Sequence, residues 1–140
     1  TQAALEHMNQ IITQDPNYAP ALNFVGYTLL ELNQDLARAK ILIEKALELE
    51  PDNGYYLDSL AWYQYTVGHH QQAWSTIQTA VSIIDNDPVM WEHYGDIARS
   101  LDQVREARHG YKQALKFDPE HPERLQSKIQ ALSDHTDAPD

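Results

Sequence analysis

Residues 46–51 read ALELEP and residues 114–119 read ALKFDP, which is the same order of alanine, leucine, charge, apolar residue, acid and proline. The two hexamers start 68 residues apart, and 68 is twice 34. Proline cannot continue a helix, because it lacks the backbone N–H and its ring clashes with the preceding turn. Each hexamer therefore predicts the end of a helix, and their spacing predicts a repeated unit of 34 residues.

The same helix ending occurs at two further places in the chain. Residues 80–85 read AVSIID, with Asp85 in place of the proline, and residues 11–16 read IITQDP. Predicted endings thus fall at positions 16, 51, 85 and 119. Alanines stand twelve residues before all four endings and five residues before the last three, at Ala4, Ala39, Ala73, Ala107, Ala46, Ala80 and Ala114.

Each unit contains two stretches with helical periodicity. Residues 54–67 and 71–84 both place apolar side chains at i, i+3 or i+4 spacing, which predicts two amphipathic helices. Gly68 lies between them and suits the left-handed turn that ends a helix. Small alanines at fixed positions let paired helices approach closely. The corresponding predicted pairs are 19–32 with 36–49 and 88–101 with 104–117.

The two ends of the chain depart from this pairing. Residues 2–14 predict a helix without a first-helix partner, so we expect further repeats upstream in the native protein. Residues 122–133 predict a terminal helix with a polar outer face, as the end of a helical array requires. The polar residues 134–140 are predicted to be a disordered tail.

The repeated pattern resembles the tetratricopeptide repeat family. The first-helix signature of that family is similar to LNFVG at 22–26, LDSLA at 57–61 and WEHYG at 91–95, and the second-helix alanines match as described above. The turn at 32–35 holds one extra residue, Asp85 replaces a proline, and Gln64 replaces a usual aromatic. The amino-acid sequence of residues 26–62 is also similar to sequences of exported bacterial proteins of this family, which are often lipid-anchored.

The resemblance implies an all-α fold, a right-handed superhelical solenoid of antiparallel helix pairs. We expect one domain over 1–133, comprising a half repeat 1–16, repeats 17–51, 52–85 and 86–119, and a capping helix 122–133.

In this family the first helices line a concave groove that holds a peptide or a partner helix. Carried over helix by helix, the resemblance implies that the groove residues are Asn23, Tyr27, Asp58, Trp62, Tyr65, Glu92, Asp96 and Arg99. The sequence thus predicts an aromatic–acidic groove that binds a polypeptide, because aromatic side chains supply rigid contact area and carboxylates select basic or backbone-donor partners. Trp62 has two interpretations, as the anchor for that partner or as a side chain packed between repeats.

Some family members hold a carboxylate with a basic cluster on their first helices. At the corresponding places this chain has no lysine or arginine: Asn23, Tyr27, Ser59, Val89 and His93. A carboxylate-binding cochaperone is therefore disfavoured.

Charge and composition exclude several classes of function. The 140-residue chain carries 21 acids against 10 bases, a formal net charge of −11, which disfavours binding to nucleic acid or to anionic lipid. The chain lacks cysteine, which removes thiolate catalysis and zinc–thiolate sites. Residues 59–84 hold no Asp, Glu, Lys or Arg, but their many Gln, Ser, Thr and His side chains argue against membrane insertion.

No motif in the sequence supports an enzyme, a cofactor or a metal site. His93 and Asp96 stand one helical turn apart, but a zinc site needs three or four protein ligands. Acidic pairs such as Asp85 and Asp87 lie at helix ends, where Asp87 predicts an N-cap. The sequence thus favours a non-enzymatic binding module or adaptor, with catalysis the least supported class.

A structural self-association domain is the alternative. Two surfaces could carry a homodimer: the open helix at residues 2–14 and the uncharged segment 59–84, where Trp74 is predicted to cover the helix pair from outside. The resemblance to exported proteins suggests a role in the periplasm or at the outer membrane of a Gram-negative cell.

Overall fold

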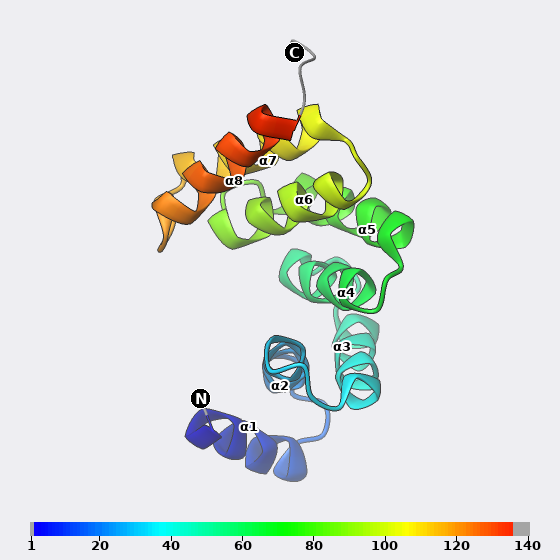
Figure 1. The fold of residues 1–140 in the computed structure, drawn as a ribbon. Helices are drawn as coiled ribbons and strands as arrows, with labels where there is room; N and C mark the ends of the chain where they lie inside the picture. Colours follow the sequence, from blue (N-terminus) through cyan, green and yellow to red (C-terminus); the bar gives the residue numbers. More distant parts are fainter. Residues whose placement is uncertain (1, 136–140) are drawn as a thin grey trace.

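The computed structural model describes residues 2–135, and within that range every regular element is an α-helix. The helices follow one another as a curved stack (Figure 1). Their bounds are α1 (Gln2–Gln14), α2 (Ala19–Glu31), α3 (Leu36–Leu49), α4 (Gly54–Thr66), α5 (His70–Ile83), α6 (Pro88–Ser100), α7 (Val104–Lys116) and α8 (Pro122–His135).

The helices pair as the repeat pattern predicts. The most extensive contacts are within the hairpins α2–α3, α4–α5 and α6–α7, and each hairpin packs on the next through α3–α4 and α5–α6. The first helices α2, α4 and α6 also contact one another in sequence. Helices α1 and α8 pack on the two ends of this series. The solenoid of three full repeats, a leading half repeat and a closing helix is therefore confirmed.

Side chains and turn residues set the helix ends. Asn53 accepts hydrogen bonds from the backbone N–H groups of Tyr55 and Tyr56, and Asp87 accepts one from Met90, so both are N-caps. The N-cap predicted at Asp87 is confirmed. Gly68 follows α4 with φ of 90°, a left-handed conformation that glycine adopts without steric cost, as predicted.

One turn within a hairpin is longer than the other two. Residues 32–35 join α2 to α3, whereas residues 67–69 and 101–103 join the later hairpins. Asn33 and Asp35 both have positive φ, at 52° and 42°, because the extra residue forces two left-handed conformations into one turn. Asp35 still caps α3 by accepting from the N–H of Arg38. The predicted site of the extra residue is correct.

The closing helix runs further than the sequence predicted. Helix α8 includes residues 134 and 135, so the predicted tail at 134–140 begins two residues too early. The helix continues because no proline or glycine interrupts residues 123–135. The remaining part of the predicted tail, 136–140, lies outside the described residues.

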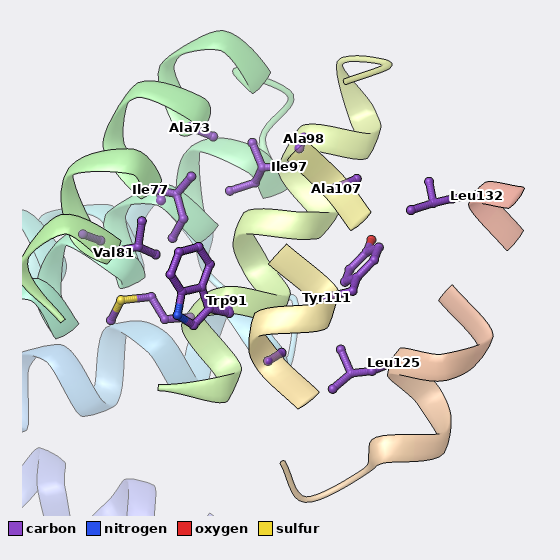
Figure 2. Close-up of a cluster of buried hydrophobic side chains, with 14 residues drawn as sticks. Ala73, Ile77, Val81, Trp91, Ile97, Ala98, Ala107, Tyr111, Leu125 and Leu132 are labelled. Carbon is purple, nitrogen blue, oxygen red and sulfur yellow. The ribbon is translucent and has the colours of Figure 1, made fainter. Parts of the chain in front are cut away.

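The repeated alanines form the centre of the core. All six alanines of the second helices, at both repeated positions, are fully buried, which allows each second helix to approach its partner closely. Larger side chains fill the space around them. Figure 2 shows Trp91 of α6 close to Ile77 and Val81 of α5, while Tyr111 of α7 faces Leu125 from α8.

The uncharged segment 59–84 does not form a bilayer-spanning element. Within residues 2–135 each helix is too short or too polar to cross a membrane. On α5 the hydroxyls of Thr76, Thr79 and Ser82 donate to carbonyls of their own helix, which satisfies the polar groups locally. Trp74 is partly buried and packs on Tyr94 of the next repeat, with ring centroids 4.7 Å apart. Trp74 thus joins two repeats, and the predicted self-association surfaces stay predictions.

Candidate functional site

Two neighbouring cavities lie along the first helices of the repeats. The first cavity, of about 480 Å³, lies between α2 and α4 and reaches the start of α6. The predicted site residues Asn23, Tyr27 and Asp58 are in its wall. The other lining residues are Pro20, Phe24, Thr28, Glu31, Asn53, Tyr55, Tyr56, Ser59, Asp87 and Val89.

The second cavity, of about 420 Å³, continues from the first toward α8. The two share Tyr27, Glu31 and Val89, and together they are called the groove below. The second cavity is lined further by Trp62, Glu92, His93, Asp96, Glu120, His121, Arg124 and Lys128. Six of the eight predicted site residues therefore lie in the groove wall.

His93 is the centre of the wall between the two cavities. Its Nδ1 lies 2.8 Å from Asp58 Oδ1 of the preceding repeat, and its Nε2 lies 3.3 Å from the Tyr27 hydroxyl two repeats back. Trp62 stacks on the imidazole, with ring centroids 4.1 Å apart. One histidine thereby connects the first helices of all three repeats. The burial of His93 was not predicted from the sequence, where histidines were expected on the surface or in the groove.

The position of Trp62 is compatible with both interpretations of its sequence position, packing between repeats and contact with a partner. It lies in a stack between His93 and Tyr65, with 4.8 Å between the Trp62 and Tyr65 centroids, so it packs between repeats. It also lines the second cavity. Its role as a partner anchor stays a prediction.

The acids of α6 are paired within the chain. Arg124 of α8 reaches both oxygens of Glu92, at 2.6 and 2.8 Å. Lys128 Nζ lies 2.8 Å from Glu92 Oε2 and 2.9 Å from Asp96 Oδ1. Asp96 also accepts a hydrogen bond of 2.6 Å from the buried Tyr111 hydroxyl. These two carboxylates are thus neutralised where the groove meets α8.

Two predicted site residues lie elsewhere. Tyr65 stacks on Trp62 and meets His70 edge-on, and Arg99 is exposed; neither side chain lines the groove. The sequence reasoning missed Arg124 and Lys128. Their signal was present, since the basic pair is spaced by four residues, as are Glu92 and Asp96 on the previous first helix.

The electrostatics of the groove follow from burial and from these acids. Burial raises the pKa of the Tyr27 hydroxyl, and the fields of Asp58, Glu31 and Asp87 raise it further. Burial also opposes ionisation of Glu92, but hydrogen bonds from Arg124 and Lys128 outweigh it and lower the pKa of Glu92 below its ordinary value.

His93 is a buried titratable group in the wall of the groove. Burial lowers the pKa of His93, but the charge of Asp58, its hydrogen bond and the fields of Asp96 and Glu92 outweigh burial, so the pKa lies above its ordinary value. The protonated imidazole donates from both nitrogens, toward Asp58 and toward the Tyr27 hydroxyl.

We expect the stability of the domain to fall as the pH rises through the folded-state pKa of His93, which lies above the ordinary histidine value of about 6.5. A histidine whose pKa is raised by folding stabilises the native state fully below its unfolded pKa, and this stabilisation is lost as the pH passes the folded pKa. Urea unfolding at several pH values measures the effect. His93→Gln is expected to remove this decline, and an unchanged pH profile in that variant would assign the titration to another group.

The described residues contain no metal centre. Among them, no three His, Asp or Glu side chains are arranged to hold a metal ion. His93 and Asp96, which are fewer ligands than a zinc site needs, instead contact Asp58 and Lys128.

Comparisons with known proteins define the class of this solenoid. The model of the tetratricopeptide repeat family matches residues 19–53 and 89–121. A TPR repeat-containing protein of Pseudomonas aeruginosa is 41% identical over 58 residues, which are 41% of this chain and 10% of that protein. The matched stretch thus spans about a tenth of the curated relative's length.

Solved structures of this class share the fold. MamA superimposes with a TM-score of 0.75 at 17% identity, covering 94% of this chain and 76% of that one. A tetratricopeptide repeat protein of Thermus thermophilus superimposes with a TM-score of 0.75 at 17% identity, covering 93% of this chain and 71% of that one. The first tetratricopeptide repeat domain of Spaghetti, solved with an HSP90 peptide, superimposes with a TM-score of 0.73 at 18% identity. The match covers 84% of this chain and 91% of that one.

The fold and the matched repeats define a helical-repeat solenoid of the tetratricopeptide class. Residues 19–53 and 89–121 of the chain are thus tetratricopeptide repeats.

Proposed function

We propose that this domain is an adaptor that binds a segment of a partner protein along the groove. The observation that carries the proposal is the pair of adjoining cavities, which run across the first helices of three repeats and over the start of α8. Exposed apolar side chains line this path: Tyr55 is 52% exposed and Val89 is 48% exposed. Large side chains that are half exposed beside a hollow surface are typical of protein-binding sites.

The charge of the groove supports a partner that is not acidic. The peptide in the Spaghetti structure reads SRMEEVD, which has more acids than bases. Here the first cavity is lined by three carboxylates, Glu31, Asp58 and Asp87, and among the described residues no lysine or arginine joins its wall. Like charges would therefore disfavour that kind of peptide. A non-enzymatic role is part of the same proposal.

Replacing Val89 by tryptophan tests the proposal. Val89 lines both cavities and is half exposed, so a bulky ring there fills the groove without opening the core. We expect Val89→Trp to weaken partner binding by about tenfold, the effect of losing roughly 1.4 kcal/mol of contact. The measurement is capture of partners from a library of random peptides, with affinities determined by fluorescence anisotropy.

Ile41→Trp is the matched control. Ile41 is 64% exposed on α3 and lines neither cavity, so the same enlargement there leaves the groove untouched. Thermal melts of both variants check that the fold is retained. Equal binding by both variants would place the partner surface outside the groove.

A further inference from the structure

First helices of neighbouring repeats meet through acid–base contacts at two of the junctions in this chain. Between α4 and α6, Asp58 contacts the imidazole of His93 at 2.8 Å. Between α6 and α8, Glu92 and Asp96 are met by Lys128, and Glu92 also by Arg124. At each of these junctions, an acid on one first helix faces a basic side chain of the next helix, and the His93 imidazole is cationic when it is protonated.

The junction between α2 and α4 lacks this contact. Counting back one repeat, Asn23 takes the place of Asp58, and Ser59 takes the place of His93. The Ser59 hydroxyl donates to the carbonyl of Tyr55 in its own helix and does not reach across. The side-chain oxygen of Asn23 is buried and has no hydrogen-bond partner. The short serine leaves space at this junction, and the first cavity lies there.

The carboxylates of the first cavity come from three helices or their caps. Glu31 is near the end of α2, Asp58 lies on α4, and Asp87 caps α6. His93 offsets Asp58, but no basic residue among the described lining residues offsets Glu31 or Asp87. The raised pKa of the Tyr27 hydroxyl reflects burial together with the field of these same three acids. The cavity therefore attracts positive charge.

Aromatic side chains form much of the remaining wall of the first cavity. Phe24, Tyr27, Tyr55 and Tyr56 line it, and Tyr55 is more than half exposed. Aromatic faces attract cations through their ring quadrupoles and also bury the methylene groups of long basic side chains. A volume of about 480 Å³ is far more than one water molecule needs, so a long side chain fits.

We propose that the first cavity binds the cationic side chain of a lysine or arginine from the partner. This side chain supplies to the α2–α4 junction the positive charge that His93, Arg124 and Lys128 supply at the later junctions. Its N–H groups are donors for Glu31 and Asp87, and for the oxygen of Asn23 once that amide turns into the cavity. The inference rests on the proposed function and specifies the chemistry of the partner.

The test uses the complete 140-residue chain and peptides selected from a random library. Each selected peptide is remade with its lysines and arginines replaced, one at a time, by glutamine. We expect one such replacement per peptide to weaken binding about tenfold or more, as loss of a charge-assisted hydrogen bond does. Competition with acetyl-arginine amide shows whether a free cation suffices or whether the peptide chain is required.

Variants of the protein provide the reciprocal measurement. Glu31→Gln with Asp87→Asn removes two charges from the cavity while asparagine retains the N-cap of α6. We expect this pair to weaken binding of the basic peptides about tenfold. Glu44→Gln with Glu48→Gln removes the same charge from exposed sites on α3 and controls for general attraction to an acidic protein.

The outcomes separate this inference from the proposed function. Suppose that Val89→Trp blocks peptide binding but that replacing any lysine or arginine of the peptide leaves binding unchanged. The groove then binds peptides, and the cation site is refuted. Equal weakening by the two charge-removing pairs also refutes it. If Val89→Trp blocks no peptide, the proposed function fails, and NMR titration with acetyl-arginine amide decides the cation site: absence of shifts at Tyr27 and Tyr55 refutes it.

Discussion

Replacement of Gly110 by valine is expected to lower the free energy of unfolding by about 3 kcal/mol. A Cβ atom at Gly110 would lie 2.7 Å from Tyr94 Cδ1, 2.9 Å from the backbone N of Gly95 and 3.0 Å from the carbonyl oxygen of Trp91. Two of these neighbours are backbone atoms of α6, which cannot move aside as a flexible side chain can. Valine therefore separates α6 from α7 along the hairpin, and the core alanines around it lose contact.

The consequence should be local to the last repeat. In a helical array each repeat contacts only its neighbours, so the loss concentrates in α6, α7 and α8. Hydrogen exchange by NMR is expected to show faster exchange in these helices and retained protection in α2 and α3. The melting temperature is expected to fall by about 10 °C.

Lys112→Val is the control for this prediction. Lys112 is exposed on the same helix, so valine there changes helix propensity without meeting a neighbour, and surface changes of this kind cost about 0.5 kcal/mol. Should both variants melt at the same temperature, the close approach of α6 and α7 at Gly110 would be wrong.

Replacement of Lys128 by methionine is the second large expected effect, also about 3 kcal/mol. Lys128 is 22% exposed, and the carboxylates that it contacts, Glu92 and Asp96, are 9% and 11% exposed. Methionine retains the apolar stem but leaves Asp96 without a cation and Glu92 with only Arg124. Breaking a largely buried ion pair by removing one partner costs more than the pair contributes, because a charge then stays desolvated.

Arg124→Gln should cost less, about 1 kcal/mol or below, because the Arg124 side chain is 53% exposed and Lys128 still neutralises Glu92. Adding Asp96→Asn to Lys128→Met is expected to restore part of the stability, since the neutral amide needs no counter-charge. Urea unfolding of the four proteins measures these differences. If Lys128→Met and Arg124→Gln lower the free energy of unfolding equally, burial does not make the Lys128 ion pairs more important than that of Arg124.

The groove could be predicted in part. Asn23, Tyr27 and Asp58 were placed by the family resemblance together with the repeat register, because residues one repeat apart take the same position on successive first helices. Tyr65 and Arg99 were placed by the same rule but do not line the groove. Helical spacing predicts the direction of a side chain around the helix axis only within a few tens of degrees. That precision does not distinguish a side chain in the groove wall from one beside it.

The repeat period, the helix hairpins and the small residues at their crossings were determined by the sequence itself, because they depend on local periodicity, on turn residues and on spacing within about one repeat. The internal partners of the acids were decided only by the tertiary structure. Asp58 meets His93 across 35 residues, and Glu92 meets Lys128 across 36, so their pairing depends on how successive repeats rotate against each other. That rotation follows from the packing of the whole stack, which is why only the three-dimensional structure shows which carboxylates of the groove are paired within the chain.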